Sequence, residues 1–333
     1  MSSTEATTDL PSGDPVPSSA APAPAPHPKP EPEPEPEPSS PKQTTALSTL
    51  LAATPSNLDA FLAHVQRCLQ TPQGIDTSLL FLCYTTRLGS ASLDLLTRPA
   101  LRASAERLLA LAAALPPSAT LVFTSTALPS RGAALALRLA RRLKAFSAML
   151  SDARAFLRLW GLLGMYFWFR RLVAAAKSSD EKNKSDRVET AIAWAQLSAC
   201  VVFQALENAT YLAAKGVIGL APATQGKAGR WSARFWGAFV GLEIGRLFYD
   251  SHKRGLRTRA EKFAGDKTVA EVEREEHEWK DNWRKTLVRQ LAWAPLTVHW
   301  SLEQGLVSEL AVGALATIPG VIQMRDLWRR TAE

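Results

Sequence analysis

From about residue 45 onward, apolar positions recur with the three-to-four-residue spacing of α-helices. In the stretch SNLDAFLAHVQRCLQ, residues 56–70, they fall on one face, and the Ser-Asn pair at its start is a suitable N-cap. Two further helices are expected at 74–96 and 99–115, because proline is favoured in the first turn of a helix and Pro99 therefore starts the second. The pattern predicts amphipathic helices around a leucine-rich core.

The segment AALALRLARRLKAFSAML, residues 133–150, separates apolar from basic side chains. At about 100° per residue, the large apolar side chains share one sector and most basic ones lie opposite, with Arg142 at the boundary. No acidic residue occurs between Glu106 and Asp152, whereas a solvated face usually mixes both signs of charge. We expect this helix to lie in the headgroup region of a membrane; an ordinary surface helix of a soluble bundle is the alternative. The predicted lipid-facing residues are Leu135, Leu139, Leu143, Phe146 and Leu150, and the predicted phosphate-facing residues are Arg138, Arg141, Arg142 and Lys144.

Longer apolar segments follow this helix. Residues 159–169 are uncharged and rich in aromatic side chains, but they are too few to cross a bilayer. They suit either a membrane interface or a buried core helix. Two helical hairpins are expected near 191–249 and 287–324, and residues 305–324 have the length of a spanning helix. Charged residues and Pro295 within these hairpins leave open whether each segment spans fully.

Glycine recurs every four residues at Gly237, Gly241 and Gly245. On a helix these positions share one face and allow the backbone of a neighbouring helix to approach closely, as is common in membranes. We therefore expect a helix-packing face here, and tight packing inside a soluble bundle is the alternative.

Residues 1–45 differ from the rest, because proline alternates there with alanine or glutamate. Proline lacks the backbone donor and fixes φ, so this composition predicts a disordered, extended tail. The remainder, residues 46–330, is expected to form one helical domain, with amphipathic helices over 46–150 and membrane-embedded or membrane-associated helices over 151–330. No pattern of β-strands or β-hairpins is present. The predicted fold class is all-α: a membrane-associated bundle with amphipathic helices and two C-terminal helical hairpins.

The net charge of +8 and the pI near 9.6 indicate an anionic partner. An anionic phospholipid membrane is favoured over nucleic acid, because no motif for reading bases is present. Lys/Arg-rich loops, including 170–190, predict that these loops and both termini face the cytosol. The three cysteines form no CxxC pair, and no metal-ligand spacing, nucleophile–base pair or carboxylate dyad is recognisable. We expect neither an enzyme nor a metal or other cofactor.

Four stretches resemble those of a known protein family, both in their amino-acid sequences and in their order along the chain. They are ARAFLRLWGLLGMYFWF, FQALENATYLAAKGVIG, SARFWGAFVGLEIGRL and LVSELAVGALATIPGVIQMRDLW. With these stretches the chain resembles, over roughly residues 45–330, the peroxisomal biogenesis factor 11 family, in particular its fungal and gamma-like branch. The proline-rich tail is not part of the family pattern.

The resemblance implies a protein of the peroxisomal membrane that elongates and remodels this membrane before fission. It implies insertion of an amphipathic helix into one leaflet, for which residues 133–150 are the candidate. It also implies self-association and recruitment of fission machinery of the dynamin type. A solute-conducting channel is the alternative, in which Glu207, Glu243 and Arg246 would line a pore. A soluble scaffold is a further alternative.

Overall fold

The computed structural model describes residues 55–114, 130–177, 187–264 and 268–332. The regular secondary structure of these residues is helical, which confirms the all-α fold class. The proline-rich tail lies outside the described residues. The helices are α2 (Pro55–Cys68), α3 (Pro72–Ala114), α4 (Arg131–Leu157), the 3-10 helix η1 (Arg158–Trp160), α5 (Gly161–Lys177), α6 (Arg187–Ala214), α7 (Pro222–Ala264), α8 (Val269–Ser301) and α9 (Glu309–Arg330).

Helix α3 is continuous through Pro99, so the prediction of two helices separated at this residue was wrong. Pro99 has no N–H to donate, and the helix therefore loses one backbone hydrogen bond. The loss is local, because the part of α3 before Pro99 is held by packing against α4 and α9. The part after it is rich in alanine, leucine and arginine, which are strong helix formers.

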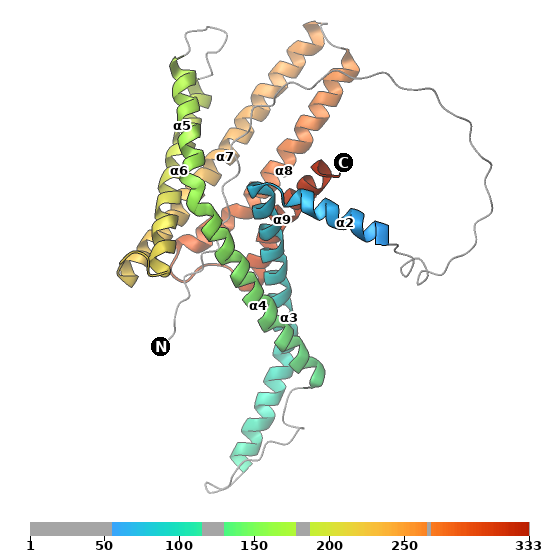
Figure 1. Ribbon diagram of the computed structural model, residues 1–333, viewed down its shortest axis with the longest axis vertical. Helices are drawn as coiled ribbons and strands as arrows, with labels where there is room; N and C mark the ends of the chain where they lie inside the picture. Colours follow the sequence, from blue (N-terminus) through green and yellow to red (C-terminus); the bar gives the residue numbers. More distant parts are fainter. Residues whose placement is uncertain (1–54, 115–129, 178–186, 265–267, 333) are drawn as a thin grey trace, which may run out of the picture.

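Helices α3 and α4 form a long antiparallel pair that projects from one end of the molecule (Figure 1). The Ser90 hydroxyl donates to the carbonyl of Ala140 at 2.9 Å, and the Ser147 hydroxyl donates to the carbonyl of Cys83 at 2.9 Å. These side chains are small, so the two backbones approach closely. The two bonds fix the register of the pair.

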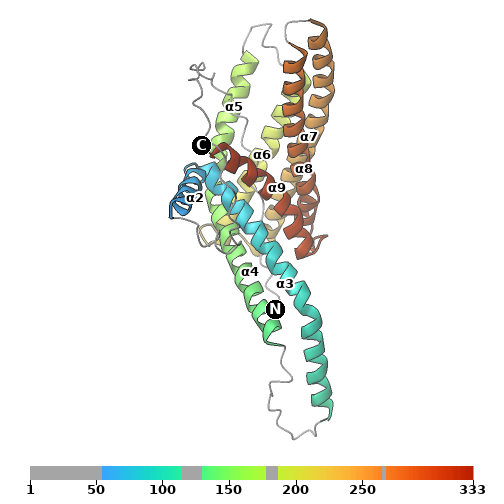
Figure 2. The ribbon, with the colours of Figure 1, turned by 90° about the vertical axis from the view of Figure 1, so that its right-hand side faces the viewer.

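The two expected C-terminal hairpins are present: α7 folds back along α6, and α9 follows α8 after a short loop (Figure 2). Helix α9 packs most extensively against α3. A Cβ added at Gly313 would lie 2.9 Å from the Cα of Leu88, and one added at Gly320 would lie 3.3 Å from the Cα of Phe81. Glycine is thus required on α9 because the backbone of α3 occupies the space of a side chain.

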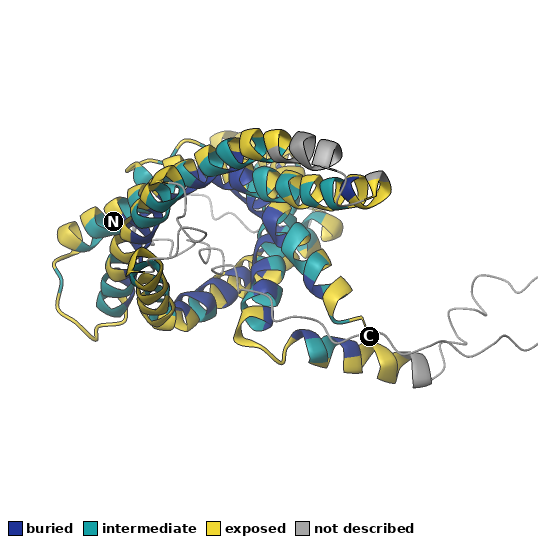
Figure 3. Ribbon diagram, turned by 90° about the horizontal axis from the view of Figure 1, so that it is seen from above, coloured by how far each residue is buried: buried dark blue, intermediate teal, exposed yellow. Residues whose placement is uncertain are grey.

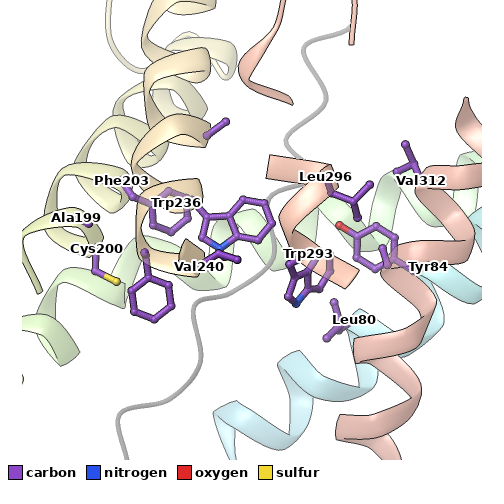
Figure 4. Packing of buried hydrophobic residues seen from close by; sticks show 13 residues of the cluster. Leu80, Tyr84, Ala199, Cys200, Phe203, Trp236, Val240, Trp293, Leu296 and Val312 are labelled. Carbon is purple, nitrogen blue, oxygen red and sulfur yellow. The ribbon is translucent and has the colours of Figure 1, made fainter. Parts of the chain in front are cut away.

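One hydrophobic core joins α3 with the two hairpins, and Figure 4 shows its residues. Trp236 of α7 lies at its centre, with ring centroids 5.6 Å from Trp293 and 5.7 Å from Trp300. Tyr84 of α3 contacts Trp293 from the other side, at 5.8 Å between centroids. Seen from above, buried residues line the inner sides of the helices and exposed residues their outer sides (Figure 3).

The structure corrects the expected spanning segment at 305–324. Helix α9 begins only at Glu309, with the Ser308 side chain as its N-cap, so residues 305–308 belong to the preceding loop. Among the described helices, α6 is the one with the length and hydropathy needed to cross a membrane. About a third of its most apolar window, 33%, is buried inside the protein, so the same helix also serves the core.

Candidate membrane-binding surface

The predicted lipid-facing residues of α4, here called the apolar ridge, are partly exposed and partly buried. Leu135, Leu139 and Phe146 are exposed by 68%, 47% and 40%. Leu143 is half-buried beside Gly89 of α3. Leu150, expected to face lipid, is instead only 6% exposed. The face of α4 that packs on α3 is rotated toward one edge of the ridge, and it covers Leu150.

The four predicted phosphate-facing cations are all exposed. None of Arg138, Arg141, Arg142 and Lys144 makes an ion pair with another residue that the structure describes. At about 100° per residue, Arg138 and Arg142 lie beside the exposed apolar row, while Arg141 and Lys144 lie farther around the helix. Two of the cations are therefore placed where apolar side chains and phosphates could be contacted together.

The exposed apolar row continues beyond residue 150, which the sequence analysis missed. Met149, Phe156 and Leu157 are exposed. Leu157 lies in the same sector of α4 as Leu135 and Phe146, and Met149 and Phe156 border this sector on the side of Arg138 and Arg142. Trp160, in η1, is the most exposed aromatic residue of this region, at 72%. The signal was present in the sequence as further apolar residues at helical spacing after Asp152.

Helix α5, which follows η1 directly along the chain, exposes further apolar and aromatic side chains. Leu163, Tyr166, Phe167 and Phe169 are exposed, and no residue of α5 is buried. This arrangement differs from a buried core helix, one of the two readings of residues 159–169. Large contiguous apolar patches on a monomer usually mark an interaction site. We define the exposed apolar residues of α4, η1 and α5, from Leu135 to Phe169, as the α4–α5 surface.

A buried cluster of polar side chains fixes the junction between α4 and α5 on α6. Arg158 of η1 makes two hydrogen bonds with the Glu207 carboxylate, from Nη2 at 2.7 Å and from Nε at 3.1 Å, and both side chains are buried. The Gln204 amide donates to the same carboxylate at 3.1 Å and to Asn208 at 2.7 Å. Asn208 in turn donates to the carbonyl of Leu159 at 3.1 Å. The direction of the α4–α5 surface relative to α6 therefore depends on this cluster.

A second polar cluster joins α6 and α7. Gln196 donates to the Glu243 carboxylate at 2.7 Å, and Arg246 donates from Nε to the same carboxylate at 2.9 Å. Arg246 also pairs with Asp250 at 3.1 Å. Gln196 and Glu207 are three helical turns apart on α6, which corresponds to about 16 Å. The structure thus pairs the three charges of the channel alternative in two separate clusters and does not bring them together at one site.

The glycine face of α7 is only partly in contact with another helix. A Cβ added at Gly237 would lie 3.1 Å from the Thr297 hydroxyl of α8, so this glycine permits a close helix approach. Gly241 and Gly245 are exposed, and an added Cβ would meet no described atom within 4 Å. Gly313 and Gly320 of α9, which the sequence analysis did not select, lie instead against the backbone of another helix, α3.

The described residues contain no group of three or more histidine, cysteine or acidic side chains that could hold a metal ion. Cys68, Cys83 and Cys200 are buried and unbridged. Burial raises the pKa of the Cys83 thiol above its ordinary value, which disfavours the reactive thiolate. These cysteines therefore act as small core side chains.

Comparison with known proteins gives two matches. Residues 124–328 match the model of the peroxisomal biogenesis factor 11 family. The chain is also similar to an uncharacterised protein of Schizosaccharomyces pombe, with 26% identity over 181 residues, which are 54% of this chain and 73% of the relative. No solved structure matches. The family match begins after α3 and includes the whole α4–α5 surface, whereas the resemblance in the sequence was expected to begin near residue 45.

Proposed function

We propose that this chain, which belongs to the peroxisomal biogenesis factor 11 family, elongates and remodels the peroxisomal membrane before fission by inserting the α4–α5 surface into one leaflet. Membership of the family gives it a role in peroxisome proliferation at the peroxisomal membrane, by membrane remodelling and not by enzymatic catalysis.

The observation that carries the proposed mechanism is the exposure of large apolar side chains along α4, η1 and α5. Leu135, Leu139 and Phe146 lie beside arginines of α4 that make no ion pair with any described residue, and Trp160 continues the row toward α5. In a headgroup layer, the apolar side chains would leave water for the acyl region, and each nearby cation would contribute about 1 kcal/mol against anionic lipid. Insertion into one leaflet expands it relative to the other, which favours positive curvature.

The family resemblance supports further parts of the proposal. The chain acts at the membrane as a homo-oligomer, and the open glycines Gly241 and Gly245 offer a surface where a second copy could approach closely. It recruits fission machinery of the dynamin type. Both termini face the cytosol, and the chain is of the fungal, gamma-like branch. Residues 1–45 form a tail outside the helical domain of residues 46–330.

The test uses the full chain and anionic vesicles. The triple variant Leu135→Gln, Leu139→Gln, Phe146→Gln should fold normally, because all three side chains are exposed. It should bind vesicles at least about tenfold more weakly and no longer tubulate them, since three apolar side chains of roughly 1.5–3 kcal/mol each would be lost from the interface. Co-sedimentation and electron microscopy measure the two effects.

A matched control replaces three leucines of similar exposure elsewhere, namely Leu96→Gln, Leu109→Gln and Leu306→Gln. The control should bind and tubulate like the natural chain. Equal tubulation by the triple variant would refute the role of α4, and an equal loss in both variants would show that apolar content matters without regard to position.

A further inference from the structure

A polar cavity of about 420 Å³ lies where the first turns of α3, the middle of α8 and the end of α9 meet. It is remote from the α4–α5 surface in sequence, and none of its lining residues belongs to α4, η1 or α5. Every lining side chain is polar or charged, whereas cavities for apolar ligands are lined mainly by hydrophobic residues. The cavity therefore suits a hydrophilic ligand.

The charge of the cavity selects an anion. Lys285 and Arg289 of α8 and Arg329 and Arg330 of α9 line it, against Asp326 as the acidic lining residue. Lys285 is partly neutralised, because its ammonium lies 3.3 Å from Asp326 and 2.8 Å from Asp281 outside the cavity. Basic side chains thus outnumber acidic ones in the lining by four to one. Arginine presents several N–H donors in a planar fork, which matches the oxygens of a phosphate.

The remaining lining groups favour hydroxyl groups on the same ligand. Gln73 and Thr77 of α3 and Asn282 of α8 contribute amides and a hydroxyl, which can both donate and accept hydrogen bonds. The N-terminal end of α3 adds partial positive charge on this side of the cavity. A single phosphate would leave most of this volume and most of these neutral groups unused.

We propose that this cavity binds a phosphorylated polyol, with the arginines of α8 and α9 holding the phosphate and the amides and hydroxyl of α3 and α8 holding the hydroxyl groups. Two sources have this chemistry: a phosphoinositide headgroup in a membrane and a free inositol phosphate. Binding of a headgroup would add lipid selectivity, because the α4–α5 surface distinguishes membranes only by their negative charge and by access to the acyl region. A free inositol phosphate would bridge α3, α8 and α9 and stabilise their junction.

The test has a soluble arm and a vesicle arm, both with the full chain in mild detergent or on vesicles. Titration calorimetry uses myo-inositol monophosphate, with inorganic phosphate as the comparison ligand. Flotation uses phosphatidylcholine vesicles that contain phosphatidylinositol monophosphate, or phosphatidylserine at equal surface charge. The variant Arg329→Gln, Arg330→Gln changes the exposed end of α9 and should leave the fold intact, which circular dichroism checks. The control Arg274→Gln, Arg284→Gln removes the same charge from exposed positions of α8 outside the cavity.

We expect myo-inositol monophosphate to bind more tightly than inorganic phosphate, and the α9 variant to weaken this binding at least about tenfold while the α8 control retains it. Selective flotation with the phosphoinositide that depends on Arg329 and Arg330 identifies the lipid headgroup as a ligand. Soluble binding without selective flotation identifies the free polyol phosphate. Absence of both, or equal loss in variant and control, overturns the proposal. Failure of this proposal and failure of the proposed membrane insertion can be told apart, because the Leu135, Leu139, Phe146 variant leaves every cavity residue unchanged.

Discussion

The variant Glu207→Gln should destabilise the protein strongly, because it leaves the Arg158 guanidinium buried without a counter-charge. One Glu207 oxygen accepts a hydrogen bond from Arg158 Nη2, and the other accepts from Arg158 Nε and from the Gln204 amide. A glutamine offers one acceptor oxygen and one NH₂ group, so in either orientation at least one donor would face another donor. Both side chains of the pair are buried, so water does not screen the loss.

Removal of one partner from a buried ion pair typically costs about 3–5 kcal/mol. Arg158 Nη1 has no hydrogen-bond partner among the described residues even in the natural chain, so the guanidinium has no second acceptor in place that could offset the loss. The free energy of unfolding is measured by urea titration in mild detergent, followed by circular dichroism. The double variant Arg158→Met, Glu207→Leu removes both charges and should recover most of the loss, since apolar replacements of buried pairs are often neutral or stabilising.

The single variants Arg158→Met and Glu207→Leu complete a cycle with this double variant, and the coupling free energy of the cycle isolates the pair. A loss below about 1 kcal/mol for Glu207→Gln would refute the reasoning, because it would place the pair among exposed ion pairs. A double variant as unstable as the single one would show that packing at η1, and not charge pairing, holds the junction.

Two further predictions concern the helix contacts and the α8–α9 loop. Gly313→Val should cost about 1–3 kcal/mol of unfolding free energy, because its Cβ would lie 2.9 Å from the Leu88 backbone. Gly241→Ala should be neutral or gain up to about 1 kcal/mol, since no described atom lies within 4 Å of the added Cβ. Urea titration compares the two variants, and equal effects would contradict the α9–α3 contact. His299 Nδ1 accepts hydrogen bonds from the N–H groups of Leu306 at 2.8 Å and Val307 at 3.1 Å, and burial lowers the pKa of its imidazole below its ordinary value. The neutral form is favoured in the folded state, so this stabilisation is complete above about pH 6.5 and is lost as the pH falls through the lower folded-state pKa. Thermal unfolding should therefore show a stronger acid destabilisation for the natural chain than for His299→Gln, and identical pH dependence would exclude this role.

The sequence predicted those parts of the fold that depend on local spacing. The helices and the two hairpins follow from apolar periodicity and from loop composition, which are properties of neighbouring residues. The continuity of α3 through Pro99 could not be predicted, because it depends on packing by α4 and α9. For the same reason, the periodicity of α4 showed that Leu139 and Leu150 share a sector, but not that Leu150 is buried while Leu139 stays exposed.

Contacts between distant segments were not accessible from spacing at all. Arg158 and Glu207 lie in separate helices, and their pairing depends on how η1 docks on α6. The polar cavity combines residues near position 75 with residues near 285 and 326, so no local motif exists for it. The α5 aromatics were recognisable as suited to an interface, but the choice between an interface and a core required their exposure, which only the three-dimensional arrangement gives.

The packing of α4 limits how the proposed membrane insertion can work. Because Leu150 is buried and Leu143 half-buried against α3, the apolar side chains available to lipid are those on the outer edge of the ridge, such as Leu135, Leu139 and Phe146. A helix held on one side by a neighbour can enter the headgroup layer only to the depth of these side chains, unless it separates from α3. Separation would break the two buried serine–carbonyl bonds that set the register of the pair, without new donors for those groups. Shallow insertion is therefore the lower-energy route. It makes the aromatic residues of α5 necessary for the proposed mechanism, since they supply the apolar area that α4 keeps against α3.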